Sequence, residues 1–263
     1  MEFNYDQIIL GSDIPITENV NIHVPTIGDL AKGGDSEFRL YTQIFTISVR
    51  EQFSGMPNEV DKIEEEYPTF WDMAFDNEFN QQIGESMFGE GNDLKSVIIN
   101  GLAYWTQTES TTYRALSNKK IINESLDWII DINEFNRICS YIKMATLSRP
   151  NEDLIAPKGI SSKPHQCEIW KKLYAGRVRK LQNKPNQSLG DKILVLQAYA
   201  PGYVDFKDVK NMTYYQFANL LETYQKRYAN EREFLIYTAY KFDTSKMKLN
   251  DLGEEISQIK LKK

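Results

Sequence analysis

The sequence predicts a mostly α-helical fold with a small β element, an α+β chain whose helices pack as a bundle-like body. Apolar residues recur at helical spacing along most of the chain. The stretch 99–130 differs, because it combines strand-like runs with the turn residues of a β-hairpin. The hydrophobic share of 41% and the aromatic share of 12% over 263 residues are those of a chain that can bury a core.

The first predicted elements are a short strand and a short helix. Val20, Ile22 and Val24 alternate with polar residues, which is typical of a half-buried strand. Thr26 is in the right place to cap a helix, and Asp29 follows three residues later as an acidic variant of the capping box. We therefore expect a helix to begin directly after Thr26.

A double glycine follows, and it raises the question of a phosphate-binding loop. Such a loop needs glycines before a helix N-terminus, commonly with a lysine inside it. Here Gly33-Gly34 is followed by Asp35 and Glu37, whose charges would repel a phosphate. We interpret the pair as a hinge between helices, with a buried helix over 37–53.

The next segments predict helices around the hairpin. An aromatic-rich helix is expected over 70–79, and the stretch 93–106 is compatible with a helix or a strand. The hairpin would turn at Ser117-Asn118 and end in a strand over 126–130. Asp131 would then cap a further helix.

Charge and composition predict two lobes. Residues 1–100 carry 19 Asp/Glu against 5 Lys/Arg, whereas residues 101–263 carry 18 against 26. We predict an acidic N-terminal lobe over 1–148 and a basic helical C-terminal lobe over 165–263 with a polar tail. The segment 149–164 between them holds three prolines and little apolar content, so it is predicted to be a linker, mobile or functional.

Within the C-terminal lobe, helices are expected over four segments, and the polar tail is expected to fray. The predicted helical segments are 165–184, 188–200, 213–228 and 231–240. Opposite charge on the two lobes also suggests mutual attraction, or head-to-tail self-association between copies.

Motifs of known chemistry do not occur in the sequence. It has no dinucleotide-binding, P-loop, zinc-protease, nucleophile-elbow or kinase motif. His165 and Cys167 form a lone H-x-C without a second pair of ligands, so no metal site is predicted, although a Cys–His nucleophilic pair stays open in principle. We predict no catalytic, cofactor-binding or metal-binding residue. An enzyme without a readable site remains an alternative.

No apolar run is long enough to span a bilayer, and the N-terminus lacks the pattern of a signal peptide. The two cysteines exclude a disulfide framework. These features favour a protein of the cytoplasm.

The basic stretch 165–184 is a candidate nucleic-acid contact. Trp170 and Tyr174 lie among lysines and arginines, as in single-strand binders. An apolar stripe that includes Ile169 and Leu173 borders them, however, which favours packing, and a pI near 5.2 argues against a dedicated nucleic-acid binder. Under this alternative the contacts would be Lys171, Lys172, Arg177, Arg179 and Lys180.

Three segments carry a family resemblance. The stretch "IHVPTIGDLAKGGDSEFRLYTQIFT" resembles the opening of tail assembly chaperone-type proteins from phages and prophages of Gram-positive bacteria, and "IDINEFNRICSYIK" and "MTYYQFANLLETYQKRYANEREFLIYTAYKFDTSKMKLND" resemble later parts of the same proteins. The positions that match the opening pattern are Ile22, Pro25, Thr26, Ile27, Gly28, Asp29, Leu30, Gly34, Asp35 and Phe38.

The resemblance implies a non-enzymatic protein of the host cytoplasm that binds the tape-measure protein during tail assembly. The alternative in the same setting is a minor tail or baseplate component that is retained in the virion. No family binding site carries over. The candidate partner anchors are aromatic residues of two helices, whose simpler interpretation is core packing. These candidates are Phe70, Trp71, Phe75, Tyr214, Tyr215 and Phe217.

Overall fold

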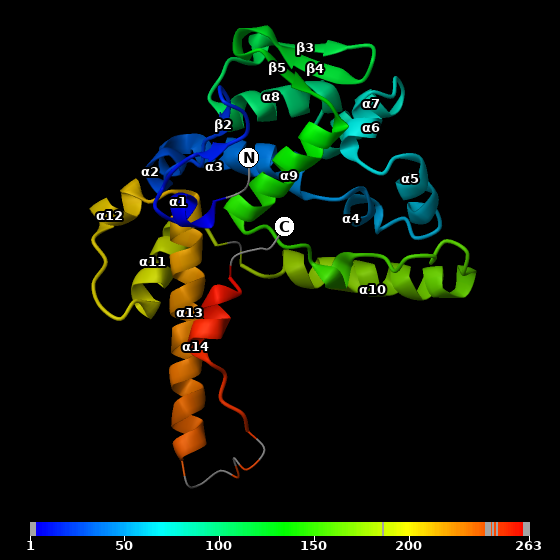
Figure 1. Ribbon diagram of the computed structural model, residues 1–263. Coiled ribbons are helices and arrows are strands. Elements are labelled where there is room, and N and C mark those ends of the chain that lie inside the picture. The colour runs from blue at the N-terminus through cyan, green and yellow to red at the C-terminus, as the bar shows by residue number, and fades with distance from the viewer. Residues whose placement is uncertain (1–3, 186, 240–242, 244, 246, 260–263) are drawn as a thin grey trace.

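A computed structural model describes residues 4–185, 187–239, 243, 245 and 247–259, and it confirms a mostly α fold with a small β element (Figure 1). The helices α3, α8 and α9 pack together, and α13 projects away from them (Figure 1). The α-helices are α1 (Tyr5–Ile9), α2 (Ile27–Asp29), α3 (Asp35–Thr46), α4 (Val49–Phe53), α5 (Val60–Glu66), α6 (Phe70–Ala74), α7 (Phe79–Phe88), α8 (Leu94–Thr106), α9 (Ile132–Thr146), α10 (Pro164–Gln182), α11 (Leu189–Tyr199), α12 (Phe206–Asn211), α13 (Tyr214–Thr238) and α14 (Leu252–Ser257).

Two small antiparallel sheets make up the β element. The first pairs β1 (Ile14–Pro15) with β2 (Asn21–Ile22). The second is a meander of β3 (Tyr113–Leu116), β4 (Lys120–Asn123) and β5 (Trp128–Ile130) in that order. The predicted hairpin is therefore confirmed, but it begins later than the expected residue 99.

The helix α8 occupies the start of the expected hairpin. The Asp93 side chain caps it by accepting a hydrogen bond from the Ser96 backbone N–H. Val97, Ile98 and Leu102 then lie buried at helical spacing. Because both a cap and an apolar face are present, this stretch folds as a helix.

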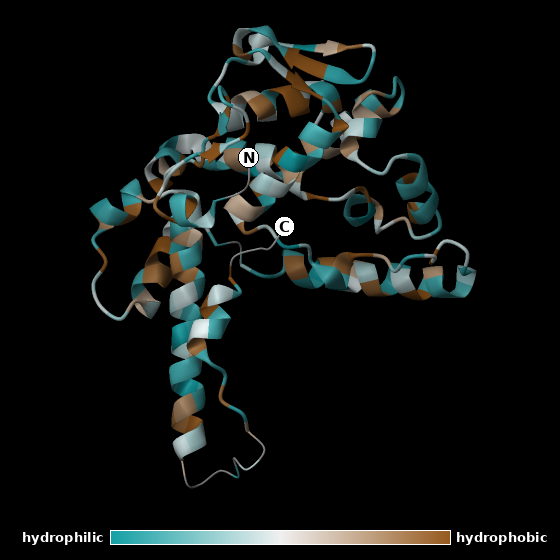
Figure 2. Cartoon of the chain, in the orientation of Figure 1, coloured by the Kyte–Doolittle hydropathy of each residue, from teal (hydrophilic) through white to brown (hydrophobic). Residues whose placement is uncertain are grey.

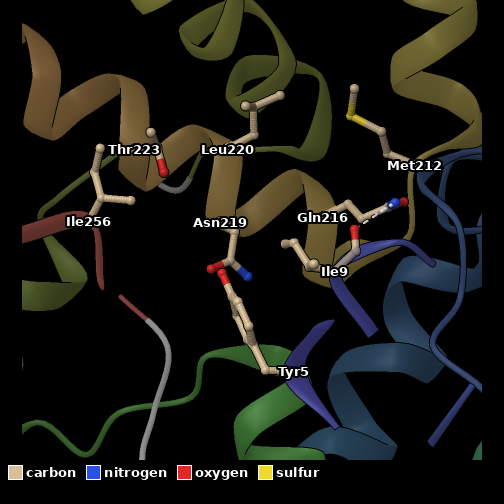
Figure 3. Close-up of a pocket in the computed structure, with 8 residues that line it drawn as sticks. All are labelled: Tyr5, Ile9, Met212, Gln216, Asn219, Leu220, Thr223 and Ile256. Atoms are coloured by element: carbon tan, nitrogen blue, oxygen red, sulfur yellow. Dashed lines mark hydrogen bonds between the residues drawn. The ribbon is translucent and has the colours of Figure 1, made fainter. Parts of the chain in front are cut away.

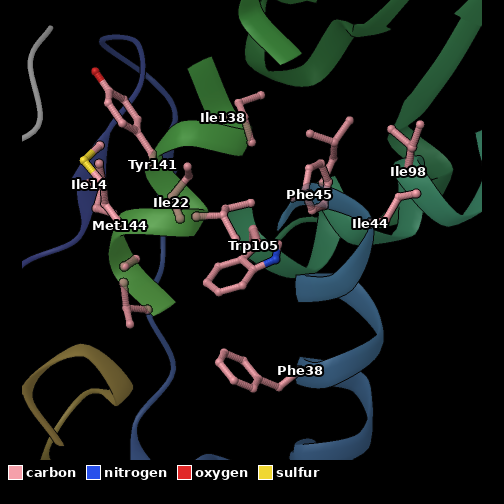
Figure 4. Packing of buried hydrophobic residues seen from close by; sticks show 14 of the residues in the cluster. Ile14, Ile22, Phe38, Ile44, Phe45, Ile98, Trp105, Ile138, Tyr141 and Met144 are labelled. Carbon is pink, nitrogen blue, oxygen red and sulfur yellow. The ribbon is translucent and has the colours of Figure 1, made fainter. Parts of the chain in front are cut away.

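The main core lies where α3, α8 and α9 pack together (Figure 4). Trp105 is fully buried at its centre, and its indole N–H donates to the Tyr41 carbonyl over 3.2 Å. Phe38 lies 5.8 Å from the Trp105 ring, centroid to centroid. Large aromatic rings thus supply much of the buried apolar surface of this core.

The main core also includes residues from the C-terminal third of the chain. Tyr215, Phe217 and Leu196 belong to the same buried cluster as Trp105. Backbone hydrogen bonds join the two regions as well, since the N–H of Tyr214 donates to the carbonyl of Pro25 over 2.8 Å. Residues of both predicted lobes therefore share one core.

The predicted linker 149–164 is not a free connection, which corrects that expectation. Ala156 and Ile160 are buried in a second, smaller core together with Val60, Cys167 and Trp170. Few but well-placed apolar side chains suffice to fix the segment, because hydrogen bonds from α4 and α5 hold its backbone.

Two predicted helices are divided in the structure. The expected helix over 37–53 breaks after Thr46, where Ser48 forms a capping box with Glu51 and starts α4. The expected helix over 70–79 ends at Ala74, and α7 begins at Phe79. A capping box therefore sets the start of α4, and at the start of α7 the Asp76 carboxylate accepts hydrogen bonds from the N–H groups of Glu78 and Phe79.

At the other end of the chain, two predicted helices are one. The segments 213–228 and 231–240 form the continuous helix α13, with Tyr240 outside the described residues. The residues between the two predicted segments include no glycine or proline, so the helix continues through them. Part of the predicted polar tail also folds, because α14 packs on α13 and Ile259 is buried.

Candidate partner-binding surfaces

The opening stretch forms a cap and a hinge, as predicted. The Thr26 hydroxyl accepts a hydrogen bond from the Asp29 N–H over 3.2 Å and donates to the Asp29 carboxylate over 2.6 Å. Gly33 then turns the chain with a φ of 117°, which favours glycine. Both the Thr26 cap and the Gly33 hinge are thereby confirmed.

The pocket beside this hinge is poorly suited to an anion. It has a volume of about 280 Å³, and Asp29 and Tyr104 are among its lining residues. The hydrogen bond from Thr26 lowers the pKa of Asp29, which favours its charged form. Burial, together with the charges of Glu37, Asp29 and Asp35, raises the pKa of Tyr104 to about 12. This negative environment disfavours phosphate.

A second pocket lies between α1, α13 and α14 (Figure 3). It has a volume of about 320 Å³. Its two amide side chains hydrogen-bond to backbone carbonyls. Gln216 donates to the Ile9 carbonyl, and Asn219 donates to the Tyr215 carbonyl. Tyr5 is the one titratable side chain among the described residues that line it. The lining offers no acid–base pair for catalysis.

The cysteine and histidine residues do not form a reactive pair. Cys167 is buried and its thiol donates to the Ile160 carbonyl over 3.2 Å, whereas His165 is exposed at the start of α10. Desolvation raises the pKa of the Cys139 thiol to about 12, so that thiol is not an activated nucleophile. Over the described ranges, no group of three or more His, Cys, Asp or Glu could hold a metal ion.

The structure places four of the six candidate anchors in the core. Phe70, Trp71, Tyr215 and Phe217 are each at most 3% exposed. Trp71, for example, packs on Phe135 with ring centroids 5.1 Å apart. In this conformation these four side chains hold the fold together and are not accessible to a partner.

The two remaining candidate anchors are also engaged in packing. Tyr214 is half-buried and lies 4.7 Å from the Phe38 ring, centroid to centroid. Phe75 is half-buried beside Trp71, with ring centroids 5.0 Å apart. None of the six side chains belongs to an exposed apolar surface.

The aromatic residues of the basic helix α10 pack against the protein, as the sequence favoured. The Trp170 indole N–H donates to the Ser54 carbonyl over 2.7 Å, and Trp170 is 8% exposed. Tyr174 packs beside it and against Gly55. These rings are therefore not available to stack on bases.

Two of the five basic candidates on α10 form ion pairs within the chain. Lys171 pairs with Glu168 over 3.3 Å, and Arg177 pairs with Asp153 and lies over the Trp170 ring. The other three, Lys172, Arg179 and Lys180, are exposed.

The apolar stripe of α10 points to solvent, contrary to the expectation that it packs. Ile169 is 47% exposed and Leu173 is 48% exposed. The reason is that Cys167 and Trp170, on the opposite side of the helix, occupy the small core over α4 and α5. We call the side of α10 that carries Ile169, Leu173 and Gly176 the outer face of α10.

A second exposed apolar surface lies at the free end of α13. Phe234 is 54% exposed, Leu235 is 68% exposed and Ile236 is 45% exposed. Figure 1 shows this end of α13 beyond α14 and away from the body, and Figure 2 shows apolar residues along it. We call these three residues the α13 tip. The sequence feature that could have predicted this surface is the run of three consecutive apolar residues. Consecutive residues point to different sides of a helix, so one neighbouring helix cannot bury all three.

Comparisons of the chain with protein-family models, with curated proteins and with solved structures each find no match. In the described part of the chain, no helix has both the length and the apolar content to cross a membrane.

Proposed function

We propose that this chain is a non-catalytic tail assembly chaperone that binds helical segments of a phage tape-measure protein in the host cytoplasm. The observation that carries the proposal is the presence of two exposed apolar helix surfaces outside the core, the outer face of α10 and the α13 tip. The resemblance of residues 22–46 to the opening of such chaperones supports the same role.

The physical basis is the chemistry of the client. A long helical protein that has not yet been enclosed exposes apolar stripes to water, and it aggregates unless they are covered. An exposed apolar helix face can cover such a stripe by helix–helix packing. Because neither surface belongs to the core, the chain can bind without unfolding.

Affinity purification of the tagged chain from phage-infected or prophage-induced cells tests the proposal. We expect mass spectrometry of the co-purifying polypeptides to identify a long, coiled-coil-rich protein, and we expect purified phage particles to lack this chain. A stoichiometric amount of the chain in mature particles would instead support the alternative of a retained tail or baseplate component. If no tape-measure protein co-purifies and mature particles also lack the chain, both the chaperone role and the retained-component role are refuted.

A nucleic-acid-binding role is the second candidate, and the exposed Lys172, Arg179 and Lys180 favour it. It predicts salt-dependent retention on DNA that is lost when Lys171, Lys172, Arg177, Arg179 and Lys180 are all replaced by glutamine. The chaperone proposal predicts equally weak retention of the wild-type and variant proteins at 0.15 M salt.

A further inference from the structure

We infer that the outer face of α10 is a docking site for an acidic amphipathic helix of the client, an inference that rests on the proposed function. The face is defined by contiguous exposed positions on one helix, and its surroundings are basic. The first property favours a helical partner, and the second favours a partner with acidic flanks.

The geometry of the face suits a helix. Ile169, Leu173, Gly176 and Lys180 follow the i, i+4, i+7, i+11 spacing that places residues on one side of a helix. A methyl group added at Gly176 would meet no atom of the described residues within 4 Å, so the surface dips and stays open there. A partner backbone can approach closely at this dip, and its apolar side chains can then cover Ile169 and Leu173.

The charge around the face selects acidic flanks on the partner. Residues 158–184 contain eight Lys/Arg and a single acid, Glu168. Lys172 and Arg179 are exposed at the edge of the face, and Lys180 is exposed at its C-terminal end. Carboxylates on either side of an apolar partner stripe would pair with these cations at the rim, where charge complementarity sets orientation and raises the association rate.

A second copy of the chain is a poor occupant, although its N-terminal half is acidic. Among the described residues up to 100, the exposed large apolar side chains are Leu10 and Met56, which lie on separate segments. The acidic half therefore presents no exposed acidic helix with an apolar stripe. A membrane surface fits less well too, because Ile169 and Leu173 provide little area for insertion and no exposed tryptophan or phenylalanine accompanies them.

The test uses the full-length protein and two fluorescein-labelled synthetic helices of about three heptads. Both carry leucine at the a and d positions, and one is flanked by glutamate whereas the other is flanked by lysine. We expect fluorescence anisotropy to show saturable binding of the glutamate peptide, weakened as salt rises, and at least tenfold weaker binding of the lysine peptide. Equal binding of the two peptides, or of neither, would overturn the inference.

Variants locate the site. The double variant Ile169→Gln/Leu173→Gln should weaken binding of the glutamate peptide at least tenfold. The matched control Leu194→Gln changes an apolar side chain on α11 that is 62% exposed, and it should bind as the wild type does. A loss in the control equal to that in the double variant would contradict the assignment to α10.

Gly176→Leu separates docking from folding. The Cβ of the new side chain meets no atom of the described residues within 4 Å, and leucine favours a helix over glycine, so the Tm should be unchanged or higher. The bulk of leucine on the outer face should nevertheless lower peptide binding at least tenfold. Unchanged binding by this variant would refute a docked helix at this position.

The inference and the proposed function can fail separately. If the tape-measure protein co-purifies with the chain but the glutamate peptide does not bind, then the docking site is refuted and the chaperone role stands. If the peptide binds and no tape-measure protein is recovered, then the outer face of α10 is a docking site for an acidic helix, and the proposed client is wrong. Retention on vesicles of phosphatidylserine and phosphatidylcholine without peptide binding would overturn the inference.

Discussion

At the scale of single residues, Arg50 is a buried cation beside the smaller core. Its guanidinium donates to Asp61 over 2.5 Å and to Glu64 over 2.7 Å. It also donates to the carbonyls of Ala156 and Pro157, over 2.9 and 3.1 Å. This one cation therefore joins α4, α5 and the segment 149–164, and through that segment it positions α10.

Replacing Arg50 by methionine should lower the free energy of unfolding by about 3 kcal/mol, because it leaves two carboxylates and two carbonyls without their partner. Urea unfolding followed by circular dichroism measures this loss. The matched control is Arg39→Met, since Arg39 pairs with Asp35 at the surface, and its cost should be below about 0.5 kcal/mol. Similar losses in the two variants would show that the Arg50 network is not a major source of stability.

The same network predicts a pH dependence. Burial alone would raise the pKa of Asp61, but hydrogen bonds from Arg50, Ser161 and Gly159 lower it from 3.8 to about 2. A depressed pKa stabilises the fold above the unfolded-state value, and this contribution is lost as the pH falls towards about 2. Between pH 4 and pH 2 the wild type should therefore lose up to about 2 kcal/mol more than Asp61→Asn does. An equal loss in the free energy of unfolding for the two proteins between pH 4 and pH 2 would contradict this prediction.

At the scale of elements, capping residues were the most reliable sequence signals. Thr26 and Asp131 each cap the helix predicted to follow, because a short polar side chain satisfies backbone N–H groups through local geometry alone. The solvent side of α10 could not be predicted in this way. Apolar spacing predicted one buried side of α10 and the aromatic residues predicted another. Packing of Cys167 and Trp170 against α4 and α5, which the sequence of α10 does not contain, decided between them.

Two glycines in helices illustrate how packing decides the effect of one substitution. In α7, a methyl group on Gly84 would lie 2.5 Å from both the Asn92 carbonyl oxygen and the Asp93 Cα, so Gly84→Ala should destabilise the protein by about 1–3 kcal/mol. In α10, Gly176→Ala meets open space and should stabilise it by about 0.5–1 kcal/mol. Thermal unfolding of the two variants measures both. A stabilising Gly84→Ala would refute the close approach of α7 to the start of α8.

At the scale of the whole molecule, the charge asymmetry did not correspond to two separate cores. The main core draws on residues from Ile8 to Ile259, which are distant in sequence, and periodicity within a segment cannot reveal such pairings. For the same reason, the sequence could not show that most of the candidate aromatic anchors lie in the core. An aromatic stripe looks alike in a core and at an interface, and Trp71 and Phe217 turned out to face the interior.

One shared core predicts one unfolding event. Far-ultraviolet circular dichroism and tryptophan fluorescence should give coincident urea transitions, because Trp105 and the start of α13 belong to the same cluster. Two transitions, with loss of helix at a lower urea concentration than the change in fluorescence, would indicate separately folding lobes.

We propose that exposed helix faces of this chain keep a long helical protein in solution. The most direct measurement co-expresses the chain with the proposed client, a phage tape-measure protein, and quantifies that client in the supernatant and the pellet after sedimentation. We predict that the client remains in the supernatant with the wild-type chain and moves largely to the pellet with Ile169→Gln/Leu173→Gln. A client that stays in the pellet with the wild-type chain would contradict the account.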